Sequence, residues 1–256
     1  MGMRWAYGVT TVPERRADLL PSTLASLAAA GFDKPRLFID GCKPSQSDYE
    51  SLGLETTYRW PKVRAYGNWI LALAELYIRE PNMERYAIFQ DDLVTYRNLR
   101  TYLERTPYPD PCGYCNLYTF PSNQLLAPRV GAGGRWYLSN QNGRGAVGLV
   151  FSLPAVLTLL TYQGPALSVD ELRAKVAARH MVERPMDAGR GWRSLDGGVI
   201  EAMKKAGWKE WVHNPSLVQH TGKQSMIEAS HDGQRLAVSF RGENYDALAM
   251  LENGRL

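Results

Sequence analysis

The chain has 256 residues, of which 45% are hydrophobic and 22% are charged. These are ordinary values for a soluble globular protein, and the chain contains no low-complexity tract or internal repeat. The formal net charge of +4 indicates a mild preference for anionic partners and is too small to identify a nucleic-acid-binding protein by itself.

The first half of the chain alternates predicted strands with predicted helices. Leucines at helical spacing precede Gly31, which is placed to end the first helix, and a second helix runs from Asn68, as its cap, to about residue 79. The strand-forming stretches are residues 4–9, 36–39, 63–66 and 86–90, with a polar connection over 42–56. This rhythm predicts an α/β fold with a mainly parallel central sheet and helices on both faces.

The second half is less regular. A strand over residues 113–118 and a buried stretch over 146–151 are followed by predicted helices over 154–161, 169–179 and 197–206. Asp196 precedes the last of these helices in the position of an N-cap. From residue 226 the periodicity is weak, which indicates a partly extended tail.

Three predicted strands end in polar or turn-forming residues. Thr10, Thr11 and Val12 follow the first strand, Asp40 follows the second, and Gln90-Asp91-Asp92 follows the strand over 86–90. Each motif alone is a common turn. If the strands are parallel, however, all three motifs open into one ligand crevice.

Asp91 and Asp92 are the most informative pair in that crevice. Adjacent carboxylates, in a chain without a thiolate-rich or histidine-rich cluster, suit a hard cation such as Mg²⁺ or Mn²⁺. An ordinary acidic turn after a strand, without a metal, would give the same sequence pattern.

The three cysteines do not predict a disulfide framework. Cys112 and Cys115 have C-x-x-C spacing, but a zinc site would need a second pair of ligands near them. We interpret them, with Cys42, as ordinary thiols in a reducing compartment. The chain also lacks a signal peptide and the ~20-residue apolar stretch of a membrane span, so we expect a cytoplasmic protein.

Taken in order, the motifs resemble glycosyltransferases of the GT-A (Rossmann-like) fold. Gln90-Asp91-Asp92 stands in the place of the family's D-x-D motif, and residues 9–15 and 38–41 match its strand ends. Residues 215–222, Pro-Ser-Leu-Val-Gln-His-Thr-Gly, look like the corresponding part of the N-acetylglucosaminyltransferase IV type and related bacterial and viral enzymes. The match implies one catalytic domain over residues 1–225, with a nucleotide-binding half (1–97) and an acceptor half (98–225), and a tail over 226–256 that packs on it.

The resemblance implies roles at the metal and the donor. Asp92 and His220 would bind Mn²⁺ or Mg²⁺ at the diphosphate of a UDP-sugar, and Asp91 would contact the ribose or the sugar. Gln90 replaces the family's usual first acid. The other implied donor contacts are Thr10, Thr11, Val12, Arg15, Asp40, Asn68, Gly145, Ala146 and Lys223. From the residues alone, His220 is better explained as a histidine satisfied at a strand end, and Arg15 is equally one of an exposed basic pair.

An inverting enzyme also needs a base on the acceptor hydroxyl. Asp196 is our candidate, with Asp187 in reserve, although a plain N-cap explains Asp196 as well. A retaining reaction stays open if neither carboxylate is the base.

The acceptor has two readings. One is a 5-hydroxymethylpyrimidine in DNA, as in viral enzymes acting in a host cytoplasm. Its phosphates would meet two basic segments, residues 128–144 and 173–193, and its flipped base would stack on Trp136, Tyr137 or Trp192. The other is a bacterial saccharide or small molecule that stacks on the same aromatic side chains. A sugar nucleotidyltransferase and an inactive sugar-nucleotide binding protein also remain open.

Overall fold

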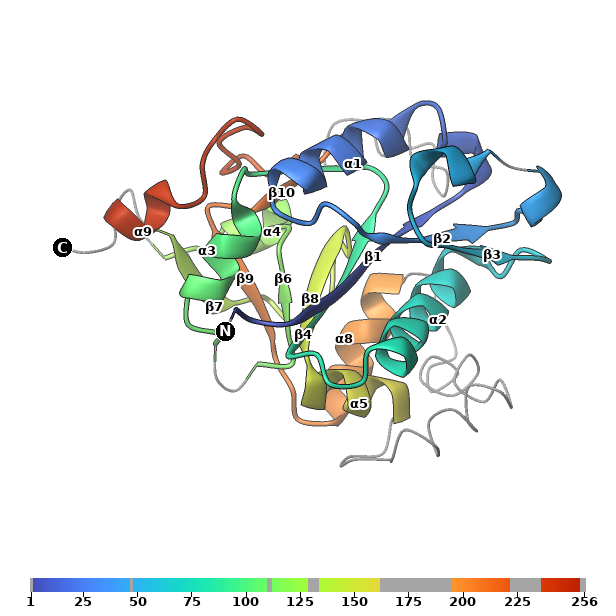
Figure 1. Ribbon diagram of the computed structural model, residues 1–256. Coiled ribbons are helices and arrows are strands. Elements are labelled where there is room, and N and C mark those ends of the chain that lie inside the picture. The colour runs from blue at the N-terminus through green and yellow to red at the C-terminus, as the bar shows by residue number, and fades with distance from the viewer. Residues whose placement is uncertain are drawn as a thin grey trace.

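The computed structural model describes residues 2–46, 48–109, 112–128, 134–161, 195–221 and 236–253. Its centre is an eight-stranded sheet in the order β3-β2-β1-β4-β8-β6-β9-β7 (Figure 1). The strands are β1 (Trp5–Thr11), β2 (Arg36–Asp40), β3 (Thr56–Arg59), β4 (Arg85–Gln90), β6 (Tyr114–Asn116), β7 (Arg135–Leu138), β8 (Gly148–Ser152) and β9 (Glu210–Asn214).

Parallel pairing dominates the first half of the sheet. β3, β2, β1 and β4 are all parallel, and β6 pairs with β9 in parallel as well. β8 is antiparallel to both β4 and β6, and β7 is antiparallel to β9. A second, two-stranded sheet joins β5 (Leu93–Thr95) to β10 (Val218–His220) in antiparallel register.

Helices cover both faces of the large sheet (Figure 1). The longer helices are α1 (Leu19–Ala29), α2 (Arg64–Arg79), α5 (Leu153–Thr161) and α8 (Leu195–Lys205). The shorter ones are α3 (Leu99–Arg105), α4 (Pro121–Gln124), α9 (Ala249–Asn253), η1 (Pro13–Arg15), η2 (Pro44–Gln46) and η3 (Tyr49–Leu52). The predicted α/β fold with a mainly parallel central sheet and helices on both faces is therefore confirmed, and it is consistent with the Rossmann-like GT-A arrangement.

The alternation of side chains along the strands divides the core into two layers. In β4, Ala87 and Phe89 pack with the α1 layer, whereas Tyr86 and Ile88 pack with the α2, α5 and α8 layer. A strand places successive side chains on opposite faces, so a nearly continuous apolar run supplies both layers at once.

Several predicted boundaries change. The strand expected over residues 63–66 is wrong, because these residues border and open α2, and the third strand is Thr56–Arg59 instead. Thr56 to Arg59 pair in parallel with β2, a tertiary contact that the local sequence does not reveal. Asn68 is not a cap, since α2 begins four residues earlier at Arg64.

The last helix also starts earlier than predicted. α8 begins at Leu195, so Asp196 lies in its first turn and is not its N-cap. The predicted helix over 169–179 lies outside the described residues. No helix in the described ranges is long and apolar enough to cross a bilayer.

The described part of the tail packs against Tyr96 and Arg97, the two residues that follow β5. The ring of Phe240 stacks on that of Tyr96, with 4.8 Å between centroids, and the Tyr245 ring meets Tyr96 edge-on at 5.0 Å. A bridge between Arg97 and Asp246 adds a backbone contact. The three cysteines are free thiols, and the Sγ atoms of Cys112 and Cys115 lie 3.7 Å apart.

Candidate active site

The two carboxylates form a buried turn between β4 and β5. Asp91 and Asp92 are 3% and 5% exposed. The Thr23 hydroxyl, on α1, lies 2.9 Å from the carbonyl oxygen of Asp91 and 3.0 Å from that of Leu93. The Thr221 N–H donates to the carbonyl of Asp92 at 2.9 Å. The turn is therefore fixed from both sides, which holds the side chains in place.

Arg15 joins the two carboxylates. Its Nη1 lies 2.5 Å from Asp91 Oδ1 and 2.9 Å from Asp92 Oδ2, and its side chain is only 14% exposed. The Thr11 hydroxyl donates to the other oxygen of Asp91 at 2.6 Å. Thr11 ends β1 and Arg15 ends η1, so the end of β1 and the end of β4 meet as the parallel register predicts.

The small sheet brings His220 to the same place. His220 pairs with Leu93 in the β5–β10 register, and its Nε2 lies 3.3 Å from Asp92 Oδ2. His220 is 7% exposed. The resemblance implied that His220 and Asp92 act together, and in the structure their side chains lie side by side.

The surroundings shift the pKa values of the two carboxylates in opposite directions. Burial is the largest influence on Asp91 and raises its pKa, although Arg15 opposes that rise. Burial also disfavours the ionised form of Asp92, but the hydrogen bond from His220 and the nearby Arg15 outweigh it and lower the pKa of Asp92. Asp92 is thus the carboxylate most strongly held in its ionised form.

Two features of these residues fit a divalent cation. Asp92 Oδ1 is buried and has no hydrogen-bond partner, and His220 Nε2 lies beside the other oxygen of the same carboxylate. Mg²⁺ is commonly held by one or two protein ligands with substrate phosphates completing its shell. Over the described ranges, no group of three or more His, Cys, Asp or Glu side chains is arranged around a metal position.

Several residues predicted to contact the donor already make hydrogen bonds within the fold. The Thr10 hydroxyl donates to the Phe89 carbonyl at 3.3 Å, and Asn68 bonds the Phe38 carbonyl at 2.9 Å and accepts from Arg59 at 2.8 Å. These side chains hold the sheet and α2 together. Asp40 accepts the Val63 N–H at 2.7 Å through Oδ1.

Asp40 and Val12 are the other residues predicted to contact the nucleoside. The Oδ2 atom of Asp40 is buried without a partner. The carbonyl of Val12 accepts from the Arg15 N–H at 3.1 Å and from the Tyr49 hydroxyl at 3.4 Å. Val12 therefore shapes the backbone turn, and Asp40 retains an unused acceptor.

The predicted sugar-side segment lies against Asp196. The Gly145 N–H donates to Asp196 Oδ2 at 2.5 Å. Gly145 has a φ of +76°, and a Cβ there would lie 2.3 Å from Tyr118, so only glycine fits. Ala146 is buried, and the Gln90 N–H donates to the Val147 carbonyl at 2.8 Å. The segment that begins at Gly145 therefore contacts Asp196 at one end and the last residue of β4, next to Asp91, at the other.

The remaining predicted residues either fall outside the described part of the chain or are used inside the fold. Lys223, Asp187, Arg129, Trp192 and the basic segment 173–193 lie outside the described residues. Of the aromatic side chains expected to stack on an acceptor, Tyr137 is buried and donates to the Asn123 carbonyl at 2.9 Å.

Trp136 is also used inside the fold. Its ring meets His213 edge-on, with 4.9 Å between centroids. The stacking role predicted for Tyr137 is therefore wrong, whereas Trp136 is half-buried and its role stays a prediction. Arg135 and Arg144, by contrast, are exposed.

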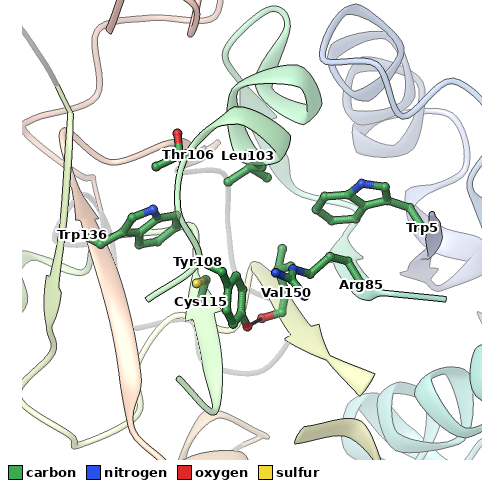
Figure 2. A pocket seen from close by; sticks show the side chains of 8 residues that line it. All are labelled: Trp5, Arg85, Leu103, Thr106, Tyr108, Cys115, Trp136 and Val150. Carbon is green, nitrogen blue, oxygen red and sulfur yellow. Dashed lines mark hydrogen bonds between the residues drawn. The ribbon is translucent and has the colours of Figure 1, made fainter. Parts of the chain in front are cut away.

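A small pocket elsewhere is distinct from this site (Figure 2). It is bordered by Trp5 and Arg85, the paired first residues of β1 and β4, so it lies at the opposite ends of these strands. Its polar groups are satisfied internally: the Tyr108 hydroxyl donates to the Val150 carbonyl at 3.2 Å, and the Arg85 guanidinium lies 3.9 Å from the Tyr108 ring centroid. This pocket is part of the packing.

The sequence did not point to Thr23 as part of the site. Its hydroxyl anchors the Asp91–Asp92 turn, yet it lies on a helix far from the motif. The available signal was a threonine between Leu20 and Leu27 on the apolar face of α1, where a buried hydroxyl needs a partner.

No protein-family model matches the chain, and no curated protein matches it. A cytidylyltransferase from Leptospira borgpetersenii is 11% identical, with 98% of this chain and 93% of that chain covered and a TM-score of 0.45.

Two structures of the glycosyltransferase GlyE from Streptococcus pneumoniae also match. The apo form is 9% identical with a TM-score of 0.42, and the other structure is 8% identical with a TM-score of 0.44. Both matches cover 82% of this chain and 45% of GlyE, so the chain spans less than half of the GlyE length. At these values the likeness is one of general chain arrangement, and the function has to be argued from the site.

Proposed function

We propose that the protein is a glycosyltransferase that binds a nucleotide-sugar donor at the carboxyl ends of β1, β2 and β4. The observation that carries the proposal is the buried Asp91–Asp92 pair at the end of β4, with His220 Nε2 3.3 Å from Asp92 Oδ2. Ligands of open α/β sheets bind outside the carboxyl ends of the strands, which is where this cluster lies.

Asp92 and His220 would hold Mn²⁺ or Mg²⁺. The cation, when bound, would neutralise charge on the leaving diphosphate. Asp91 would accept a hydrogen bond from the ribose or the sugar, and Asp40 Oδ2 would accept one from the nucleoside. Arg15 bridges the carboxylates at 2.5 and 2.9 Å and, once released from them, would place its guanidinium toward a phosphate.

We assign the base to Asp196 and the reaction to the inverting class. The acceptor hydroxyl would give its proton to the Asp196 carboxylate while its oxygen forms the new bond to the anomeric carbon. The bond from that carbon to the diphosphate oxygen breaks, and the nucleoside diphosphate leaves with the electron pair. The hydrogen bond from the Gly145 N–H to Asp196 supports the assignment of Asp196 as base, because the segment of Gly145 would pass under the donor sugar.

For the donor and acceptor we propose a UDP-sugar and a 5-hydroxymethylpyrimidine in DNA. The exposed Arg144 supports an anionic acceptor, because it directly precedes Gly145 and so lies next to the Asp196 contact. A saccharide acceptor is the alternative. Tyr137 is buried and gives neither acceptor a stacking surface, which leaves the half-buried Trp136 as the described aromatic side chain proposed for that role.

The test is UDP release from a panel of UDP-sugars with Mn²⁺, with and without DNA that contains 5-hydroxymethylcytosine or 5-hydroxymethyluracil. DNA mass is read in parallel. A sugar-sized gain on the DNA supports donor, acceptor and reaction together. UDP release without DNA modification keeps the glycosyltransferase and moves the acceptor to saccharides.

The same panel can refute the proposal. No UDP release with any donor would contradict glycosyl transfer. Release of pyrophosphate from a nucleoside triphosphate and a sugar 1-phosphate would instead identify a nucleotidyltransferase. Asp92→Asn is the negative control, because it removes a charge from the site while keeping the shape of the side chain.

A further inference from the structure

Glu210 is a buried carboxylate that the proposed mechanism does not use. It is the first residue of β9 and is 1% exposed. Its Oε1 accepts from Asn116 Nδ2 at 3.0 Å, and its Oε2 accepts from the Ser139 hydroxyl at 2.5 Å. No ion pair joins it to any described residue. Burying a carboxyl group without a cation is unfavourable unless its hydrogen bonds are satisfied, and here both oxygens are.

Two side-chain partners of Glu210, Asn116 and Ser139, lead to the segment 139–145, and the Tyr114 side chain bonds the same carboxylate. Asn116 Nδ2 also donates to the Arg144 carbonyl at 3.0 Å, so one amide group joins Glu210 to the residue before Gly145. At the other end of the segment, the Gln141 side chain donates to the Glu210 carbonyl at 2.8 Å and accepts its N–H at 3.1 Å. The Gln141 N–H donates to the Ser139 hydroxyl at 2.9 Å.

This segment has no strand ladder of its own to hold it. Gln141, Gly143 and Gly145 all have positive φ, at 57°, 58° and 76°. Its conformation therefore depends on the side chains that bond its backbone. Those of Asn116 and Ser139, with Glu210 behind both, are joined in this by the side chains of Asn123, Asn140 and Asp196. β6, which carries Asn116, lies next to β9 in the sheet (Figure 1).

The far side of the segment touches the first turn of α8. A Cβ on Gly143 would lie 2.5 Å from the carbonyl oxygen of Asp196 and 2.3 Å from Ile200 Cγ2. The Gly145 N–H donates to Asp196 Oδ2 at 2.5 Å. Burial raises the pKa of Glu210, and the charge of Asp196 adds to that rise, which agrees with the two carboxylates lying on either side of the same segment.

We propose that Glu210 is a positioning residue that holds segment 139–145, through Asn116 and Ser139, in the conformation that places Gly145 against Asp196. This inference rests on the proposed function, since it assigns Glu210 an effect on sugar transfer through Asp196. The role does not require the negative charge of Glu210. It requires one group that bonds Asn116 and one that bonds Ser139.

That requirement separates two substitutions at the same position. Glu210→Gln keeps an acceptor for Asn116. Its amide N–H can replace Gln141 Nε2 as a donor to the Ser139 hydroxyl oxygen, because Gln141 Nε2 keeps two carbonyl acceptors. Glu210→Leu has a similar volume and removes both bonds. We expect Glu210→Gln to stay within about threefold of wild-type kcat, and Glu210→Leu to lose on the order of 10²-fold in kcat with the KM for the donor within about twofold. Ser139→Ala, a milder change, should shift kcat in the same direction.

A second measurement does not depend on activity. Amide hydrogen exchange of the peptide that contains Gly145 should accelerate by about tenfold or more in Glu210→Leu and stay unchanged in Glu210→Gln. Leu27→Ala, in the core layer on the other face of the sheet, is the control for general destabilisation. It should lower the melting temperature without changing exchange at Gly145 or kcat.

The double variant with Asp196→Asn decides whether Glu210 acts through Asp196. Adding Glu210→Leu to Asp196→Asn should cost little further kcat, because residues that act as a unit are non-additive. Fully additive losses, or unchanged exchange at Gly145 in Glu210→Leu, would overturn the proposal. If wild-type protein transfers no sugar, the proposed function is what fails, and the exchange measurement alone then decides whether Glu210 holds the segment.

Discussion

Replacing Arg15 with methionine tests whether the Asp91–Asp92 pair is the cation site. In the structure the Arg15 guanidinium is the cation that both carboxylates share, at 2.5 and 2.9 Å. The side chains of the two aspartates are 4% and 7% exposed. Arg15→Met keeps most of the side-chain length and removes the charge, which leaves two adjacent buried carboxylates without it.

The size of the effect follows from that burial. Removing one partner of a buried ion pair costs about 3–5 kcal/mol. The Arg15 side chain is 14% exposed, so we take the lower end, about 3 kcal/mol. For a chain of this size, each kcal/mol changes the melting temperature by about 2–4 °C, which gives a loss of about 6–12 °C.

A divalent cation should reverse much of this loss. Mn²⁺ at a hundred times its Kd adds about 2.7 kcal/mol of stability. In wild-type protein the ion has to displace Arg15 from the carboxylates, whereas in Arg15→Met it meets them free of that competitor. We therefore expect Mn²⁺ to raise the melting temperature of Arg15→Met more than that of wild type, without any donor present.

The assay is thermal unfolding followed by circular dichroism, in EDTA and in Mn²⁺. Arg16→Met is the matched control. Arg16 is the next residue, but its partner Asp48 is 77% exposed, and a surface pair of this kind contributes only about 0–1 kcal/mol. If Arg15→Met and Arg16→Met melt alike in EDTA, the carboxylate pair does not depend on Arg15. An equal Mn²⁺ effect on Arg15→Met and wild type would refute the cation assignment.

Four further predictions test other parts of the site and the fold. Asp92→Asn should abolish Mn²⁺-dependent UDP release while circular dichroism stays unchanged; retained activity would remove the metal role. Asp196→Asn should bind the donor as wild type does in calorimetry and keep only a small residual rate of sugar transfer, and a loss of donor binding would contradict its assignment as base. Gly145→Ala should lower both stability and transfer, because its φ is +76° and its new Cβ would lie 2.3 Å from Tyr118; a fully active variant would show that the segment adapts. Burial lowers the pKa of His213 to about 4 from 6.5, so the folded state keeps this ring neutral where the unfolded chain binds a proton. The His213 contribution to stability is therefore complete above pH 6.5 and falls by about 3 kcal/mol as the pH drops from 6.5 to 4, which chemical unfolding over that range would detect and His213→Gln should flatten.

The strand ends were predictable because their pattern is local. Asp40 and Asp91 follow apolar runs long enough to be buried strands, and a parallel sheet brings such ends to one edge. The structure has both residues there, with Thr11 hydrogen-bonded to Asp91 at 2.6 Å. The partner of each carboxylate was not predictable. Arg15 read equally well as half of an exposed basic pair, and only the turn of η1 points it inward.

Helix starts were less predictable than strands. Asn68 and Asp196 both read as caps, because asparagine and aspartate favour that position. In the fold each helix begins earlier, and each side chain bonds a distant segment: Asn68 the carbonyl of Phe38, and Asp196 the N–H of Gly145. A capping preference is worth about 1 kcal/mol, and a buried hydrogen bond elsewhere can exceed it.

The sequence by itself determined the α/β class and the motif at the end of β4, since both depend on the order of apolar and polar residues along short stretches. Only the tertiary structure decided that His220 lies against Asp92, that Arg15 bridges the two aspartates, and that Glu210 and Asp196 flank one segment. These contacts join residues far apart in the chain. Their geometry is set by strand register and by the packing of helices on the sheet, which short-range patterns do not encode.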